Sequence, residues 1–157
     1  MNYKEYSDWL VNFSNAYNIP EDKKLAVYLA GIIEEIGEYE TLIYRKDEDT
    51  TIKEKKELGD VLAYLTLAKY QSEYEDIFKH EELVFIDELM QMLGGYLKRL
   101  YRGDVLSTYK LHEILSYVDL YVMSEIECRD WTLKDIMQIN YDKLTTRKQL
   151  LGTGDDR

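Results

Sequence analysis

The chain has 157 residues, enough for one domain with a core, and 45% of them are hydrophobic, which excludes a disordered protein. Its formal net charge of -11 argues against duplex nucleic acid or an anionic membrane as a partner, because both attract a basic face. One proline and 8 glycines are too few turn residues for a β-sandwich or β-barrel, so we predict an all-α fold.

Six helices are predicted in chain order, at about residues 3–17, 20–45, 52–71, 81–101, 107–127 and 132–151. Pro20 suits the start of the second helix, because its fixed φ fits the first turn. The fourth helix should stop near Gly103. The sixth should open at Thr132, with Asp135 three residues on, close to a capping box. Residues 46–51 and 152–157 are predicted loops, and the whole chain, 1–157, is predicted as one antiparallel helical bundle.

The N-terminal sequence MNYKEYSDWL lacks the apolar stretch of a signal peptide. The longest apolar run, VLAYLTLA, is far shorter than a membrane span. The single cysteine, Cys128, has no partner for an internal disulfide, which favours a reducing compartment. We therefore expect a cytoplasmic protein without membrane contact, in which Cys128 is a small buried apolar group.

Two similar stretches, EIGE at 35–38 and ELGD at 57–60, each place two acids around a glycine inside a predicted helix. At about 100° per residue, Glu35 and Glu38 share one flank of the second helix's apolar stripe. Glu57 and Asp60 share the corresponding flank of the third helix. The short loop between these helices makes them antiparallel, so the four carboxylates could converge on one groove, with Glu34 turned toward solvent.

Carboxylate ligands without histidine or cysteine favour Mg²⁺, with Mn²⁺ as a substitute. The alternative is that these acids form ordinary solvated pairs in a chain with 31 acidic residues. A di-iron centre is rejected, because it needs Glu-x-x-His and neither His80 nor His112 has that context. Gly37 and Gly59 lack a Cβ and should let a further helix approach closely.

An internal similarity aligns GEYETLIYR, 37–45, with GGYLKRLYR, 94–102. It is either coincidence in a chain with 15 tyrosines or the remnant of a duplication in which the fourth and fifth helices copy the second and third. In the second copy Met92 and Gly95 would replace the first acid pair.

The run EEIGE followed by ELGD resembles the EExxE…ExxD signature of the all-α nucleoside triphosphate pyrophosphohydrolases, which include MazG-like proteins and dimeric dUTPases. The stretches LAGIIEEIGEYETLI and KKELGDVLAYLTLA resemble the two motif helices of this superfamily. The C-terminal NYDKLTTRKQLLGTGDDR resembles the N-x-x-K-L-x-x-R segment and glycine-rich end of many MazG-like proteins. The matches cover about residues 25–71 and 132–157.

The resemblance implies Mg²⁺-dependent hydrolysis of a nucleoside triphosphate to the monophosphate and pyrophosphate. It also implies that a homodimer is compatible with the chain. The residues that it assigns to the metal are Glu35, Glu38, Glu57 and Asp60. It makes Glu34 a base, or a group that supports the metal ligands without binding the metal itself. The residues that it assigns to substrate phosphates are Asn140, Lys143 and Arg147.

Residues 72–131 depart from a minimal MazG-like chain, which has no such insertion. The alternative function is a non-catalytic helical protein that keeps the fold for nucleotide binding or protein contact. Trp9 and Trp131 are expected in the core rather than against a base. The three lysines ahead of the second acid motif could reach phosphates, although a solvated helix start is the preferred interpretation; they are Lys53, Lys55 and Lys56.

Overall fold

The computed structural model describes residues 1–45, 49–80 and 82–147 of the chain. Within them all regular structure is helical, which confirms the all-α prediction. The predicted end of the sixth helix and the C-terminal loop, at residues 148–157, lie outside the described residues, as does part of the predicted loop at 46–51. The helices are α1 (Tyr3–Ser14), a 3₁₀ turn (Glu21–Lys23), α2 (Lys24–Tyr44), α3 (Thr51–Gln71), α4 (Ile86–Arg102), α5 (Thr108–Cys128) and α6 (Leu133–Arg147).

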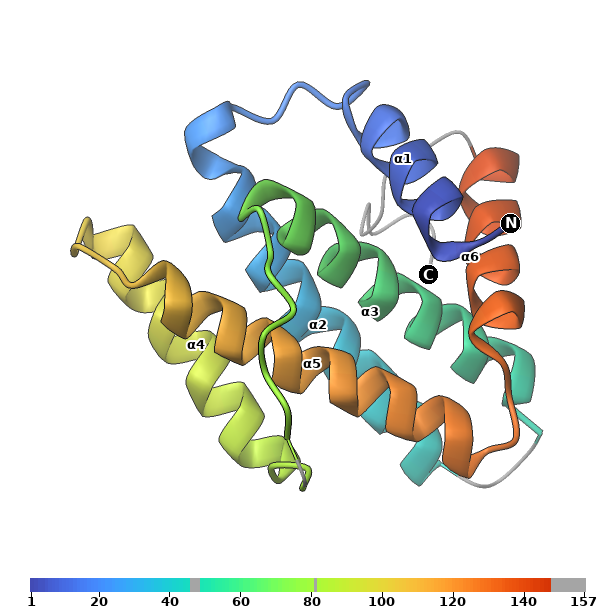
Figure 1. The fold of residues 1–157 in the computed structure, drawn as a ribbon. Helices are drawn as coiled ribbons and strands as arrows, with labels where there is room; N and C mark the ends of the chain where they lie inside the picture. The colour runs from blue at the N-terminus through green and yellow to red at the C-terminus, as the bar shows by residue number, and fades with distance from the viewer. Residues whose placement is uncertain (46–48, 81, 148–157) are drawn as a thin grey trace.

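The α3 helix is the centre of the bundle (Figure 1). It packs against α2 along its length and also contacts α6, α5 and α1, while α4 lies at the edge against α2 and α5. Because neighbours cover α3 on several sides, every residue from Leu58 to Ala68 is buried. The sequence predicted only one apolar stripe here, with Asp60 on its flank, so the structure buries that acid more deeply than expected.

Several helix ends follow the capping signals of the sequence. The Asn2 side chain accepts a hydrogen bond from the Glu5 amide at the start of α1, and Ser107 caps α5 in the same way. Gly103 ends α4 in the left-handed conformation, with φ of 79°. The Thr132 hydroxyl accepts from the Asp135 amide at 3.1 Å, which is one half of the expected capping box.

The start of α4 was predicted at residue 81, but the helix begins at Ile86. The chain ahead of it is fastened to α5 instead of being helical. The His112 ring on α5 donates from Nε2 to the Ser72 carbonyl at 2.9 Å, and its Nδ1 accepts from the Glu75 amide at 3.4 Å. His80 bonds Ser116 on the same helix. These contacts hold residues 72–80 as an extended strap across α5, visible in Figure 1. The α4 helix therefore begins later in the chain than predicted.

The prediction that Cys128 is buried was wrong. Cys128 is the last residue of α5 and is exposed, because the chain turns away from the core there toward α6. Trp9 and Trp131 pack against the core but keep part of their surface exposed. Trp9 lies 4.6 Å from the Tyr141 ring, measured between centroids. No helix in the described part of the chain is long and apolar enough to cross a membrane.

Candidate functional site

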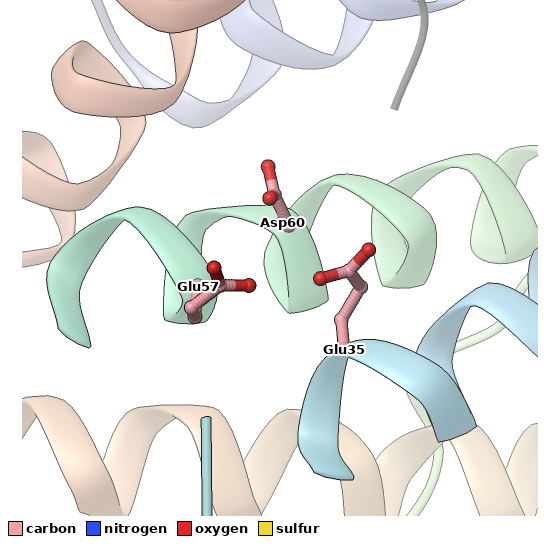
Figure 2. Close-up of side chains that lie close together, drawn as sticks. All are labelled: Glu35, Glu57 and Asp60. Carbon is pink, nitrogen blue, oxygen red and sulfur yellow. The ribbon is translucent and has the colours of Figure 1, made fainter. Parts of the chain in front are cut away.

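Three of the predicted acids meet between α2 and α3. One carboxylate oxygen from each of Glu35, Glu57 and Asp60 lies within 4.8 Å of the other two. Figure 2 shows Glu35 on α2 and Glu57 on α3 turned toward each other, with Asp60 beside them. The i, i+3 spacing on α3 puts Glu57 and Asp60 on one side of that helix, and antiparallel packing brings Glu35 opposite them. We call these three residues the acid cluster.

Burial sets the electrostatics of the acid cluster. Glu35 is 1% exposed and Asp60 3% exposed. Burial, and then the charge of Asp60, raises the pKa of Glu35 far above its usual range, so Glu35 is protonated at neutral pH. Burial raises the pKa of Glu57 to about 7, although a hydrogen bond from Glu35 opposes the rise. The cluster therefore carries protons that a bound cation would have to displace.

Two residues of α6 hold Asp60. The Asn140 amide donates from Nδ2 to Asp60 Oδ1 at 3.1 Å, and the Lys143 ammonium forms an ion pair with Asp60 Oδ2. The pKa of Asp60 is raised by burial, and the ion pair with Lys143 works against that rise. Tyr6, fully buried on α1, donates its hydroxyl to Asn140 Oδ1 at 2.7 Å and so fixes which end of the amide faces the acid. Tyr6 was not predicted, since nothing local in the sequence marks it.

The other predicted residues line a groove beside the acid cluster. This groove, of about 800 Å³, lies between α2, α3 and α6. Glu34 is exposed on its wall, and Glu38 is half-buried there, where its charge helps to raise the pKa values of Glu35 and Glu57. Lys143 and Arg147 line the α6 side. Seven of the eight predicted site residues thus belong to the acid cluster or line its groove. The eighth, Asn140, donates a hydrogen bond to Asp60 from α6.

Three cations of this groove were missed or given a different role by the sequence analysis. Lys53 and Lys56, at the start of α3, line the groove together with Arg45 at the end of α2. The solvated helix start that we preferred for these lysines is wrong for Lys55, which is half-buried and pairs with Asp135 at 2.7 Å. In a helix Lys53 lies one turn before Glu57 and Lys56 one turn before Asp60, and this spacing could have indicated their position. It cannot indicate Arg45, which lies on another helix.

The two motif glycines differ in their role. A Cβ on Gly59 would lie 3.1 Å from the Asn140 Cβ, so this glycine lets α6 approach α3 as expected. A Cβ on Gly37 would meet nothing within 4 Å, so the prediction of close packing was wrong there. Gly37 instead lines the groove. The tightest approach is at Gly31, where a Cβ would lie 2.5 Å from the Tyr64 ring.

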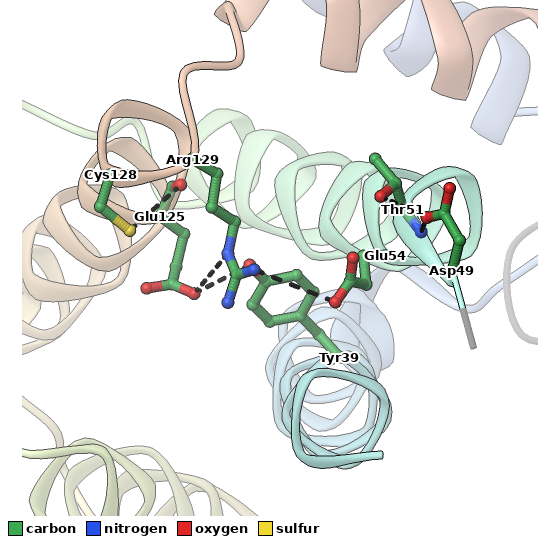
Figure 3. Close-up of polar contacts among 7 residues, drawn as sticks. All are labelled: Tyr39, Asp49, Thr51, Glu54, Glu125, Cys128 and Arg129. Carbon is green, nitrogen blue, oxygen red and sulfur yellow. Dashed lines mark hydrogen bonds and ion pairs between the residues drawn. The ribbon is translucent and has the colours of Figure 1, made fainter. Parts of the chain in front are cut away.

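A second polar network fixes the helices one turn beyond the acid cluster (Figure 3). The Arg129 guanidinium lies between Glu125, at 3.5 Å, and Glu54, at 3.9 Å, and covers the ring of Tyr39. The Tyr39 hydroxyl donates to Glu125 at 2.8 Å. Since Tyr39 follows Glu35 by one turn of α2, this network ties the helix that carries Glu35 to α5 and to the α3 turn ahead of Glu57.

The second helix pair packs beside the first, with α4 on α2 and α5 on α3. Met92 and Gly95 line a smaller pocket of about 290 Å³ between α4 and α5, next to Arg99 and Lys110. Among the residues that the structure describes, the acid grouping able to hold a metal is the acid cluster of the first pair. The duplication itself remains a prediction.

The acid cluster offers a suitable donor set for a hard divalent cation. Its ligand atoms are all carboxylate oxygens, as Mg²⁺ and Mn²⁺ prefer. Glu57 Oε2 is buried without a hydrogen-bond partner, an arrangement that costs free energy unless something binds that oxygen. Glu35, Glu57 and Asp60 are therefore the residues that could hold the ion, with Glu38 at the edge of the groove.

No protein family, no curated protein and no solved structure matches the chain. The resemblance to the all-α pyrophosphohydrolases therefore rests on the sequence motifs, and the function must be argued from the site.

Proposed function

We propose that this protein is a Mg²⁺-dependent nucleoside triphosphate pyrophosphohydrolase that converts a nucleoside triphosphate and water to the monophosphate and pyrophosphate. The observation that carries the proposal is the position of the acid cluster beside a groove that is also lined by five cations. Buried carboxylates suit a divalent ion, and lysine and arginine suit phosphates. A triphosphate that carries a metal ion would place the ion at the carboxylates and its phosphates at the cations.

Charged side chains from α2, α3 and α6 line the groove. Glu38 and Arg45 both line the groove and are seven residues apart, about two helical turns or roughly 10 Å along the axis. Lys53 and Lys56 face the Arg45 end, while Lys143 and Arg147 line the wall on α6. A phosphate chain extending from the acid cluster could therefore meet cations from three helices.

The chemistry requires a water to attack a phosphorus atom and a bridging P–O bond to break, with the electron pair leaving on the phosphate oxygen. A divalent ion, when bound, would lower the pKa of this water and neutralise phosphate charge. A carboxylate of the site would orient this water and accept its proton. The groove cations would offset charge on the departing pyrophosphate. Attack at the α or the β phosphorus gives the same products.

The test is pyrophosphate release from a panel of ribo- and deoxyribonucleoside triphosphates, with and without Mg²⁺. Asp60→Asn and Glu38→Gln should abolish Mg²⁺-dependent turnover while circular dichroism shows an intact helical fold. Glu34→Gln should lose less of this turnover, because Glu34 is exposed on the wall of the groove. Absence of turnover with every nucleotide at saturating Mg²⁺ would refute the enzyme and favour the non-catalytic alternative.

A further inference from the structure

Lys143 contacts the acid cluster directly. Its ammonium pairs with Asp60 Oδ2, and the two side chains are only 12% and 4% exposed. The other oxygen of Asp60 accepts from Asn140. Both carboxylate oxygens are thus engaged by α6, and Lys143 partly neutralises a buried group of three acids.

The same side chain also lines the groove, next to Arg147 and across from Glu38. A lysine stem is flexible and its ammonium is a compact charge with three donors, so a modest rotation can redirect it. Lys143 can therefore face either the acid cluster or a ligand in the groove.

We propose that Lys143 is the resident counter-ion of the acid cluster and that a divalent cation exchanges with it. The ammonium and a doubly charged ion compete for the same carboxylate and repel each other at short range. When the ion binds, Lys143 turns into the groove and contacts the anionic substrate. This rests on the proposed function for the identity of the substrate, but the exchange itself concerns only Lys143, Asp60 and the metal.

The exchange makes metal and substrate binding cooperative. Without the ion, Asp60 retains Lys143 and the groove lacks one of its cations. With the ion, Lys143 is released toward phosphate. By thermodynamic reciprocity, a triphosphate that holds Lys143 must strengthen metal binding by the factor by which the metal strengthens triphosphate binding.

The experiment measures Mn²⁺ binding to the full chain by calorimetry or electron paramagnetic resonance, without nucleotide. Lys143→Gln should bind Mn²⁺ about tenfold more tightly than the wild type, within the usual range of coupling between sites. Lys56→Gln is the matched control, because it removes the same charge from the same groove without a contact to Asp60, and it should change Mn²⁺ affinity much less. Lys143→Arg keeps the charge and should stay near the wild type. Lys143→Met replaces the amide variant if that variant does not fold.

The second measurement is binding of a non-hydrolysable nucleoside triphosphate analogue with and without Mn²⁺. In the wild type Mn²⁺ should strengthen analogue binding, and in Lys143→Gln this enhancement should fall about tenfold. Mn²⁺ affinity of Lys143→Gln equal to or weaker than that of Lys56→Gln would overturn the exchange, as would failure of both wild type and variant to bind Mn²⁺. Tighter Mn²⁺ binding by Lys143→Gln in a protein that hydrolyses no nucleotide would support the exchange while refuting the proposed activity.

Discussion

Replacement of Glu35 by glutamine should stabilise the protein in the absence of metal. Glu35 is buried beside two other acids, and its pKa is raised well above 7 from an ordinary value of 4.5. At pH 7 the unfolded chain has this group ionised, whereas the folded chain must protonate it. The cost is 2.5 pH units at about 1.4 kcal/mol each, or about 3 kcal/mol. Glutamine is neutral in both states and its amide can still donate to Glu57, so this cost disappears.

The effect depends on pH with a definite sign. A carboxyl group whose pKa is raised on folding contributes no penalty below its unfolded value, and it destabilises the fold progressively as pH rises through the interval up to the folded value. The difference between Glu35→Gln and wild type should therefore be close to zero at pH 4.5 and grow toward pH 8. For a chain of this size, about 3 kcal/mol corresponds to roughly 6–12 °C in melting temperature.

The assay is thermal and urea unfolding at several pH values, with Glu34→Gln as the control. Glu34 precedes Glu35 in α2 but is exposed, so its variant should unfold like the wild type. Millimolar Mg²⁺ at matched ionic strength should raise the wild-type melting temperature by mass action and raise that of Glu35→Gln less. If Glu35→Gln at pH 8 is no more stable than Glu34→Gln, the electrostatic reasoning for the acid cluster is wrong.

Other substitutions test the packing around the site. Gly37→Ala and Gly94→Ala both fill open space on a helix. Each should therefore raise the free energy of unfolding, measured in urea, by up to about 1 kcal/mol. Only Gly37 lines the groove, so only its variant should raise KM for the nucleotide; an equal KM in both would show that the groove does not hold the substrate there. Gly31→Ala should lose about 1–3 kcal/mol, because its Cβ would overlap the Tyr64 ring, and unchanged stability would contradict this contact. Tyr6→Phe should cost about 1–3 kcal/mol in the same assay by leaving a buried amide oxygen of α6 without its donor, and a neutral result would argue against that hydrogen bond.

The sequence by itself determined the features that depend on neighbours along the chain. Caps and apolar periodicity located six helices, with most ends within a few residues. The spacing of Glu57 and Asp60 placed both acids on one side of α3, because an i, i+3 relation is fixed by helix geometry alone. The short connection from α2 to α3 then implied that Glu35 would face them, as the structure shows.

The tertiary structure decided which groups meet from distant parts of the chain and how deeply they are buried. The ion pair of Lys143 with Asp60 spans 83 residues and the hydrogen bond of Tyr6 with Asn140 spans 134, so no local pattern contains them. The exposure of Cys128 and the strap held by His112 likewise depend on where α5 ends and what crosses it. Periodicity reports which face of a helix is apolar, but the packing of α2, α5 and α6 around α3 sets the burial of the acids, and burial sets their pKa values.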